Sequence, residues 1–157
     1  MPRPVLPTDP VRSALMKRVR QKRTAPEDAV AAALRGLGIR YRRNVRTLPG
    51  SPDFANVKRG WAMFVMGCFW HHHTNCPRAT VPSRNRPYWE QKFRDNRKRD
   101  AEKIRRLRAL GLSVVVVWEC EIEDRSDRSM EKLRALLHRR HPAKPRTGAA
   151  SDRAIGG

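Results

Sequence analysis

The residues WAMFVMGCFWHHHTNC, at positions 61–76, contain the stretch that decides the fold of this chain. Positions 61–66 form an uninterrupted apolar run of strand length, so both faces of that strand are apolar. Such a strand is typical of the interior of a sheet that is covered on both sides. The rest of the stretch opens an irregular segment, 67–86, in which Cys and His residues cluster. The sequence therefore predicts a central strand that leads directly into a polar loop.

The segment before this strand predicts a helix and two further strands. Thr24 and Glu27 form a helix-start signature, in which Thr24 caps the helix and Glu27 completes a capping box. Gly38 ends the helix, as a residue with positive φ does. Residues 39–47 (IRYRRNVRT) predict a strand with a basic face, and 52–57 predict a second strand. With the apolar strand they make a three-stranded meander.

The segment after the irregular loop predicts two helices and one strand. A long helix spans 87–110 and Gly111 follows its C-terminus. Residues 112–118 (LSVVVVW) predict a second strand buried on both faces, and 128–140 predict a closing helix after an acidic loop. The order of elements favours an α/β domain with a mixed sheet, and the sequence shows no internal repeat.

The charge of the chain restricts its partners. Its 157 residues include 35 Lys and Arg against 15 Asp and Glu, a formal net charge of +20. Such a field argues against a freely diffusing enzyme of small anionic metabolites. It leaves a nucleic-acid protein, an acidic-membrane binder, a secreted cationic protein and a disordered tail protein. The sequence has no apolar run of 18 residues that could span a bilayer, and its Pro-rich start does not resemble a signal peptide. We therefore expect an intracellular, cytoplasmic protein that does not bind membranes.

The two ends of the chain differ from its middle. Residues 1–23 hold seven basic residues, one acid and four prolines, so we expect a basic arm that is flexible without nucleic acid. Residues 141–157 predict a disordered tail, which leaves 24–140 as the folded domain. The arm is either a solvated tail or a segment that folds onto phosphates, with Arg12 among its contacts.

The cysteines and one histidine have the spacing of a metal site. Cys68, His73 and Cys76 lie within the irregular loop, and Cys120 ends the second apolar strand. Three thiolates and one imidazole are the ligands of a closed structural zinc site. The alternative is three buried thiols without a metal. Their common position at element ends beside a His run favours zinc.

Three adjacent histidines cannot all bind one metal. In an extended segment His71 would share a side with His73, and His72 would point away. One of them then stays free as an acid or base near neutral pH, and the chemistry alone leaves both His71 and His72 as candidates.

Aromatic and acidic residues each allow two interpretations. Phe69 and Trp70 lie in the loop, and Tyr88 and Trp89 open the long helix. They either pack in the core or stack against bases. Asp53, an acid in a basic region, is either a turn-edge ion pair or a magnesium ligand. Glu27 is fully explained by its capping box.

Six short segments between residues 12 and 122 together form one recognisable pattern. They are Arg12-Ser13-x2-Met16, Thr24-x2-Glu27, LGIRYRRNVRTLPGSPDF (37–54), GCFWHHHTNC (67–76), YWEQKFRDNRKRD (88–100) and VVVVWEC (114–120). In this combination they resemble the very short patch repair (Vsr-type) DNA mismatch endonucleases. The resemblance implies a restriction-endonuclease-like fold. It also implies a magnesium-dependent enzyme that nicks one strand of duplex DNA beside a T·G mismatch, which arises when 5-methylcytosine deaminates.

The resemblance also implies roles for individual residues. Asp53 would be the carboxylate that binds magnesium, with the main-chain carbonyl of Val65 beside it. His71 would be the catalytic histidine, which selects it over His72, and Glu27 a supporting acid. The structural zinc ligands would be Cys68, His73, Cys76 and Cys120. The residues that contact DNA would be the wedge Phe69, Trp70 and Trp89, the minor-groove residue Met16, and Arg12, Lys92 and Asn96.

Met66 departs from the family pattern. Members usually carry a His or another polar residue at this position, and a thioether neither transfers protons nor binds a hard cation. We expect the protein still to nick DNA, more slowly than a member with His, because one metal-bound acid and one base remain.

Two other functions fit the sequence. One is a zinc-stapled DNA-binding protein of the same fold that lost catalysis at position 66, and the other is a basic RNA-binding protein. For the lead interpretation we expect a monomer near the nucleoid of a bacterial-type cell. Its partners would be mismatched double-stranded DNA, a cytosine-5 methyltransferase system and mismatch-repair proteins.

Overall fold

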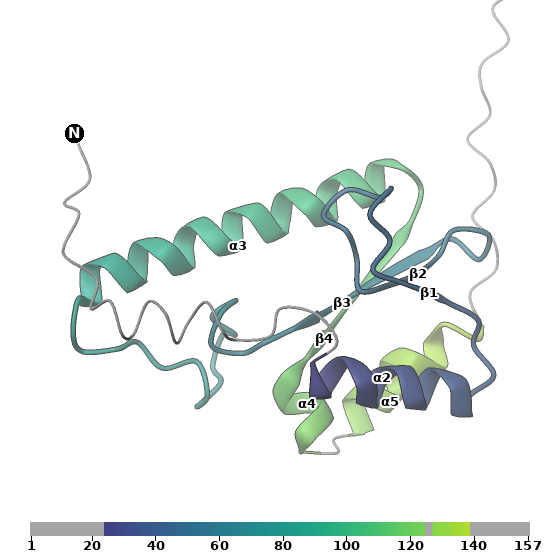
Figure 1. Cartoon of the computed structure of the whole chain (residues 1–157), viewed down its shortest axis with the longest axis horizontal. Helices are drawn as coiled ribbons and strands as arrows, with labels where there is room; N and C mark the ends of the chain where they lie inside the picture. Colours follow the sequence, from purple (N-terminus) through teal and green to yellow (C-terminus); the bar gives the residue numbers. More distant parts are fainter. Residues whose placement is uncertain (1–23, 125–126, 139–157) are drawn as a thin grey trace, which may run out of the picture.

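A computed structural model describes residues 24–124 and 127–138 as a mixed α/β fold (Figure 1). The elements are α2 (Ala25–Gly36), β1 (Arg42–Arg43), β2 (Phe54–Asn56), β3 (Trp61–Met66), α3 (Arg86–Ala109), β4 (Ser113–Trp118), α4 (Glu119–Glu123) and α5 (Asp127–Ala135). The predicted arm 1–23, with Arg12 and Met16, and the predicted tail 141–157 lie outside the described residues.

The sheet is mixed, as the order of elements predicts. Its strands lie in the order β1-β2-β3-β4. Strand β3 pairs antiparallel with β2, with Phe54 opposite Met63, and parallel with β4, with Val65 opposite Val117. Strand β3 is therefore interior, and five of its six residues are buried. The prediction of a central strand at 61–66 is confirmed.

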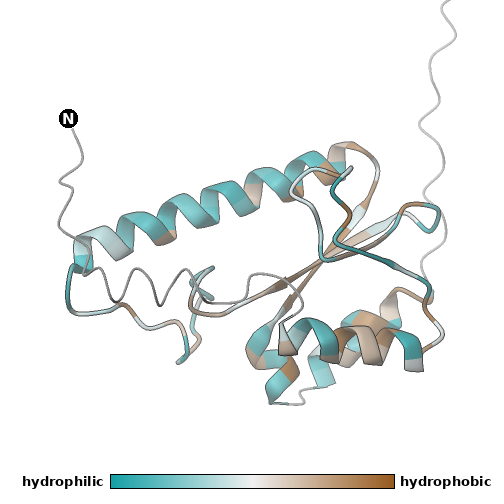
Figure 2. Cartoon of the chain, viewed as in Figure 1, coloured by the Kyte–Doolittle hydropathy of each residue, from teal (hydrophilic) through white to brown (hydrophobic). Residues whose placement is uncertain are grey.

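Helices cover both faces of the sheet (Figure 1). Successive side chains of β3 point to opposite faces. Trp61 and Met63 pack with residues of α2 and α5 in one core cluster, whereas Phe64 and Met66 pack with Leu107 of α3 in another. Figure 2 shows β3 and β4 as mainly apolar and most of α3 as hydrophilic, so α3 contributes few residues to the core cluster beneath it. Of the described helices, none is long and apolar enough to cross a membrane.

Three helix boundaries follow their sequence signals. The Thr24 side chain accepts a hydrogen bond from the N–H of Glu27 and caps α2. Gly38 and Gly111 follow α2 and α3 with φ of 68° and 82°, a backbone conformation that residues other than glycine rarely adopt. These boundaries are confirmed to within a residue or two.

The two predicted strands at the edges of the sheet differ from expectation. The predicted strand 39–47 is reduced to β1, because Asn44 has φ of 49° and the backbone then turns. The predicted burial of 112–118 on both faces is wrong. Among the residues of β4 only Val115 and Val117 are buried, because β4 is the outermost strand of the described sheet.

The acidic segment after β4 is a helix and not a loop. Glu121 accepts a hydrogen bond from the Trp118 N–H at 3.1 Å, which caps the first turn of α4. Lys132 of α5 donates to both Glu121 oxygens at 2.7 Å. The closing helix was predicted at 128–140; α5 ends at Ala135 and is followed by a turn.

Candidate active site and metal centre

Asp53 lies immediately before β2, and its carboxylate faces the neighbouring strand. Its Oδ2 accepts a hydrogen bond from the N–H of Val65 at 2.7 Å. Burial raises the pKa of Asp53 to about 6, and the charge of Glu27 adds to this. The Val65 N–H and the charges of His71 and Lys103 act in the opposite direction. Residues from four separate segments thus surround one carboxylate.

The main-chain carbonyl of Val65 faces the same side as Asp53. In an antiparallel pair, the N–H and C=O of one residue point to the same partner strand. Val65 donates its N–H to Asp53, so its carbonyl lies on the β2 side of β3 as well. A carboxylate and a carbonyl offer the hard oxygen ligands that Mg²⁺ prefers.

Glu27 is buried in the first turn of α2. Its contacts fit both roles considered from the sequence, the capping of α2 and a place beside Asp53. The Thr24 hydroxyl lies 3.3 Å from Glu27 Oε1, which fits the cap. Arg43 lies 3.8 Å from Glu27 Oε2, and the charge of Glu27 acts on Asp53. Capping therefore explains the position of Glu27 without excluding a role beside Asp53.

His71 forms a close pair with Asp100 of α3. Its Nδ1 lies 2.5 Å from Asp100 Oδ2, and Lys103 Nζ lies 3.5 Å from Asp100 Oδ1. Burial raises the pKa of Asp100, but the hydrogen bond from His71 and the charges of His71 and Lys103 outweigh it, so the net shift is downward. Asp100 is consequently ionised at neutral pH, and it accepts a hydrogen bond from the Nδ1–H of His71.

Asp100 is the site residue that the sequence interpretation missed. The buried residues of α3 are Trp89, Phe93, Asp100 and Leu107. Phe93, Asp100 and Leu107 are spaced by seven residues, so the acid lies in the middle of the apolar stripe. An acid in such a stripe was a signal, because buried carboxylates are rare unless they are paired.

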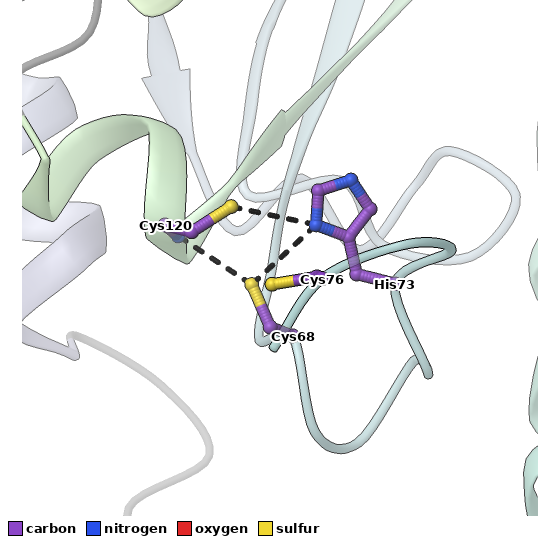
Figure 3. A group of neighbouring side chains, drawn as sticks. All are labelled: Cys68, His73, Cys76 and Cys120. Atoms are coloured by element: carbon purple, nitrogen blue, oxygen red, sulfur yellow. Dashed lines mark hydrogen bonds between the residues drawn. The ribbon is translucent and has the colours of Figure 1, made fainter. Parts of the chain in front are cut away.

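The predicted zinc ligands converge as expected from their spacing (Figure 3). Cys68, His73, Cys76 and Cys120 place their ligand atoms within 4.8 Å of one another. His73 Nδ1 lies 3.7 Å from Cys68 Sγ and 3.4 Å from Cys120 Sγ. Zinc–sulfur and zinc–nitrogen bonds at a tetrahedral angle would separate such atoms by about 3.6 Å. The residues present therefore fit a tetrahedral metal ion.

The surroundings of this cluster tie the loop to the end of β4. The ring of His73 stacks on Trp118 at a centroid distance of 4.0 Å, and the Cys68 N–H donates to Glu119 at 3.2 Å. Burial is the main cause that raises the pKa of the Cys68 thiol to about 12. A coordinated thiol is deprotonated outright, so a bound cation would reverse this shift.

The three histidines point to three different partners, and the expectation of an extended segment is wrong. Residues 67–76 form consecutive turns, and His72 has φ of 46°. His71 bonds to Asp100, His72 stacks on Phe93 at 4.7 Å, and His73 joins the thiols. His71 and His73 therefore do not share a side. The pairing with Asp100 favours His71 over His72 as the free acid or base.

The aromatic residues predicted to contact DNA form one cluster. The Phe69 ring lies 5.2 Å from Trp70 and 5.4 Å from Trp89. Trp89 is buried against Phe93, whereas Phe69 and Trp70 are only partly buried. Lys92 Nζ lies 5.4–5.7 Å from the Trp70 and Trp89 rings. Core packing thus accounts for Trp89 in this structure.

Asn96 supports that aromatic cluster through the backbone. Its side-chain amide donates to the Trp70 carbonyl at 2.8 Å, which fixes the turn that carries the aromatics. Met66, at the end of β3, is 4% exposed and packs in the core on the α3 side of the sheet. Position 66 is filled by an apolar side chain without a polar atom.

Comparison with known proteins identifies the relatives of this chain. The family described as "DNA mismatch endonuclease Vsr" matches residues 7–78. The Xanthomonas oryzae pv. oryzae protein "Type II nicking enzyme V.XorIIP" is 43% identical over 113 residues, 72% of this chain and 82% of the relative. The Escherichia coli "DNA mismatch endonuclease Vsr" is 38% identical over 126 residues, 80% of each chain.

These relatives belong to the family that the sequence motifs indicate. A third, "Type II nicking enzyme V.NaeI" of Lentzea aerocolonigenes, is 35% identical over 139 residues, 84% of this chain and 82% of the relative. The similarity extends over most of each protein and includes both the Asp53 region and the thiol cluster. The chain belongs to the Vsr family of DNA mismatch endonucleases.

Proposed function

We propose that this protein nicks one strand of duplex DNA beside a T·G mismatch in a magnesium-dependent reaction. The observation that carries the proposal is the convergence of Asp53, Glu27 and the His71–Asp100 pair where β2 begins and β3 ends. Family membership supports a DNA substrate and endonuclease chemistry. The fold assignment that accompanies this proposal is restriction-endonuclease-like, with a mixed sheet between helical layers.

In this proposal Asp53 and the Val65 carbonyl would hold the magnesium ion, which would stabilise charge on the scissile phosphate. The Val65 N–H bonds to Oδ2 and orients the Asp53 carboxylate, which leaves Oδ1 to bind the cation. Because the pKa of Asp53 is about 6, the carboxylate is ionised and able to bind a cation above that pH. Glu27 adds negative charge that favours the cation further.

His71 is proposed to take the proton from the attacking water. Ionised Asp100 accepts a hydrogen bond from the Nδ1–H of His71, which leaves the unprotonated Nε2 as the base. Asp100 also stabilises the imidazolium that forms when His71 accepts a proton. This arrangement separates the two tasks, since Asp53 holds the cation and His71 moves the proton.

The aromatic cluster is proposed to open the duplex at the mismatch. A wedge must compensate a few kcal/mol of unstacking per base step, so several rings acting together are more effective than one. Phe69 and Trp70 are partly exposed and Lys92 lies beside them, which combines a stacking surface with a positive charge. The thiol cluster would bind structural zinc and hold this loop in place. The mismatch would derive from 5-methylcytosine, so a cytosine-5 methyltransferase is the expected cellular context.

A nicking assay over a duplex panel tests the proposal. Duplexes with T·G, other mismatches and no mismatch are incubated with and without Mg²⁺, and single-strand breaks are mapped. We expect nicking of the T·G duplex only with Mg²⁺, and none with Asp53→Ala, which should still bind DNA. Asp95→Ala, on an acid of α3 that pairs with Gln91, is the matched control. Equal nicking of all duplexes would overturn mismatch specificity, and normal nicking by Asp53→Ala would overturn the site.

One observation favours a catalytically weakened DNA-binding protein as the second candidate. Met66 is buried in an apolar cluster at the end of β3, directly after Val65. Comparing the unmodified protein with Met66→His decides between the two functions. If only the variant nicks, the second candidate holds. If both nick, with the variant faster, the enzyme retains its activity. A preference for single-stranded or structured RNA would support the RNA-binding alternative over both.

A further inference from the structure

We propose that Lys103 is a further catalytic residue of this site, whose ammonium group contacts the scissile phosphate of the DNA. The inference rests on the proposed nicking function and extends it to a residue that the motifs do not assign. Lys103 lies on α3, one turn after Asp100, so both side chains project toward the same region.

The position of the Lys103 amine places it beside the carboxylates of the site. Its Nζ lies 3.5 Å from Asp100 Oδ1, while the other Asp100 oxygen contacts His71. The amine therefore lies beside the carboxylate that bonds to the proposed base, and its stem packs against Gly50, three residues before Asp53.

The stem of Lys103 is held by a glycine in the turn before Asp53. Gly50 has φ of 75°, and a Cβ at this position would lie 2.6–2.8 Å from the Cβ, Cγ and Cδ of Lys103. Contacts that short do not occur, so only glycine accommodates the stem at this distance. The turn thus forms a surface along which the Lys103 side chain runs toward the site. At 38% exposure the side chain still reaches solvent, from which a phosphate would approach.

The negative charges of the site and of the incoming phosphate would be stabilised by a nearby cation. Glu27, Asp53 and Asp100 place three carboxylates in one region, and a phosphodiester brings a further negative charge. Arg43 lies near Glu27, but it is bonded to Asp28 at 2.9 Å and lies over the Phe54 ring. Among the described residues, Lys103 Nζ has Asp100 as its hydrogen-bond partner, at the long distance of 3.5 Å. An ammonium group has three donors, so Lys103 retains donors for a phosphate oxygen.

Binding to a charge-neutral phosphate tests this contact independently of cleavage. The probe is a T·G duplex in which the scissile phosphate is a methylphosphonate, and affinity is measured without divalent cation. We expect the neutral phosphate to weaken binding of the unmodified protein by about tenfold. Lys103→Met should weaken binding of the natural duplex by a similar factor, yet lose nothing further on the methylphosphonate. Lys103→Arg should still bind the natural duplex more tightly than the methylphosphonate duplex, because it keeps the positive charge.

Lys98→Met is the matched control, since Lys98 is an exposed lysine on the same helix. The factor by which Lys98→Met weakens binding, whatever its size, should be the same on the natural duplex and on the methylphosphonate duplex. If Lys103→Met also weakens binding by the same factor on both duplexes, Lys103 does not contact this phosphate and the inference is wrong. If Lys103 only held Asp100 in place, Lys103→Met would weaken binding equally on both duplexes. This double-mutant cycle therefore distinguishes a phosphate contact from a purely structural role.

Nicking rates supply the second readout. We expect Lys103→Met to lower the single-turnover nicking rate by about 10²-fold, as loss of one transition-state donor does, and Lys103→Arg to recover part of it. Unchanged nicking by Lys103→Met would contradict the inference alone. If the unmodified protein nicks no duplex, the proposed function fails, while the methylphosphonate cycle still decides whether Lys103 contacts that phosphate. Equal thermal unfolding of the variants excludes a folding defect.

Discussion

Asp53 is a residue whose own charge opposes folding. Burial raises its pKa from 3.8 to about 6, so the folded protein binds its proton more tightly than the unfolded chain does. The resulting stabilisation is fully present below pH 3.8 and is lost as the pH rises through about 6. A carboxylate kept at this energetic cost is typical of a functional site, because a bound cation would compensate for the burial of its charge.

We predict that Asp53→Asn stabilises the protein without Mg²⁺ at pH 8, by an amount on the order of 3 kcal/mol at most. The amide removes the buried charge and still accepts the Val65 hydrogen bond. The difference between variant and unmodified protein should shrink as the pH falls through 6 and vanish near pH 4. Denaturant unfolding at a series of pH values measures it, and a difference independent of pH would contradict a buried carboxylate.

Asp100 determines which nitrogen of His71 carries the proton. We predict that Asp100→Asn lowers the single-turnover nicking rate by about 10²-fold or more, because an amide can hold the wrong tautomer. DNA affinity should change little, since Asp100 is buried beneath His71. Rapid-quench nicking and equilibrium binding measured together would separate the two effects. A large loss of affinity with unchanged chemistry would place Asp100 in DNA binding instead.

At the scale of elements, the loop 67–85 depends on contacts outside itself. It contains no helix or strand, and its turns are anchored by the thiol cluster, by Glu119 and by Asn96. Arg78 adds an ion pair with Glu123 and a second with Asp124 of the α4 region. Because the loop carries both His71 and the aromatics, the proposed catalysis and the proposed recognition would both depend on its order.

We predict that the purified protein contains one zinc ion per chain and that Cys68→Ser removes it. Loss of the metal should lower the melting temperature and the nicking rate together, because structural zinc contributes directly to folding. His72→Ala, beside the cluster but stacked on Phe93, should retain full zinc content. Elemental analysis and thermal unfolding of both variants provide the measurement. Full zinc in Cys68→Ser would show that the cluster is not the metal site.

At the scale of the whole molecule, the net charge of +20 supplies affinity and not recognition. Phosphate contacts carry no sequence information, whereas base contacts and local deformability do. The aromatic cluster occupies a small part of the surface and lies at the N-terminal end of α3. Most of the positive charge therefore lies outside the aromatic cluster, which Lys92 adjoins and to which we assign discrimination.

We predict that DNA affinity falls steeply with salt and by the same factor for matched and T·G duplexes. The logarithm of the association constant should fall by about 0.9 per phosphate contact for each decade of salt. The ratio of the two affinities should stay constant, because it arises from the aromatic residues. Titrations at several salt concentrations measure both slopes. Diverging slopes would mean that ionic contacts contribute to mismatch recognition.

The sequence by itself determined the features that depend on local patterns. The apolar run of β3 placed it inside the sheet, Gly38 and Gly111 marked helix ends, and the spacing of Cys and His residues identified the thiol cluster. These follow from periodicity, backbone conformation and ligand chemistry, which a short segment already contains. Local patterns failed for β1 and β4, because the position of a strand in the sheet decides its length and burial.

Only the tertiary structure decided which polar residues meet. Asp100 and Lys103 lie far from Asp53 in the sequence, and no local pattern pairs an acid of α3 with a histidine of the loop. The choice of His71 came from the family resemblance, and its contact with Asp100 supplies a physical reason for it. That contact exists because the end of β3 packs against α3, so the loop 67–85 that follows it begins beside that helix. Packing of apolar residues fixes this arrangement, and the chemistry of the site depends on it.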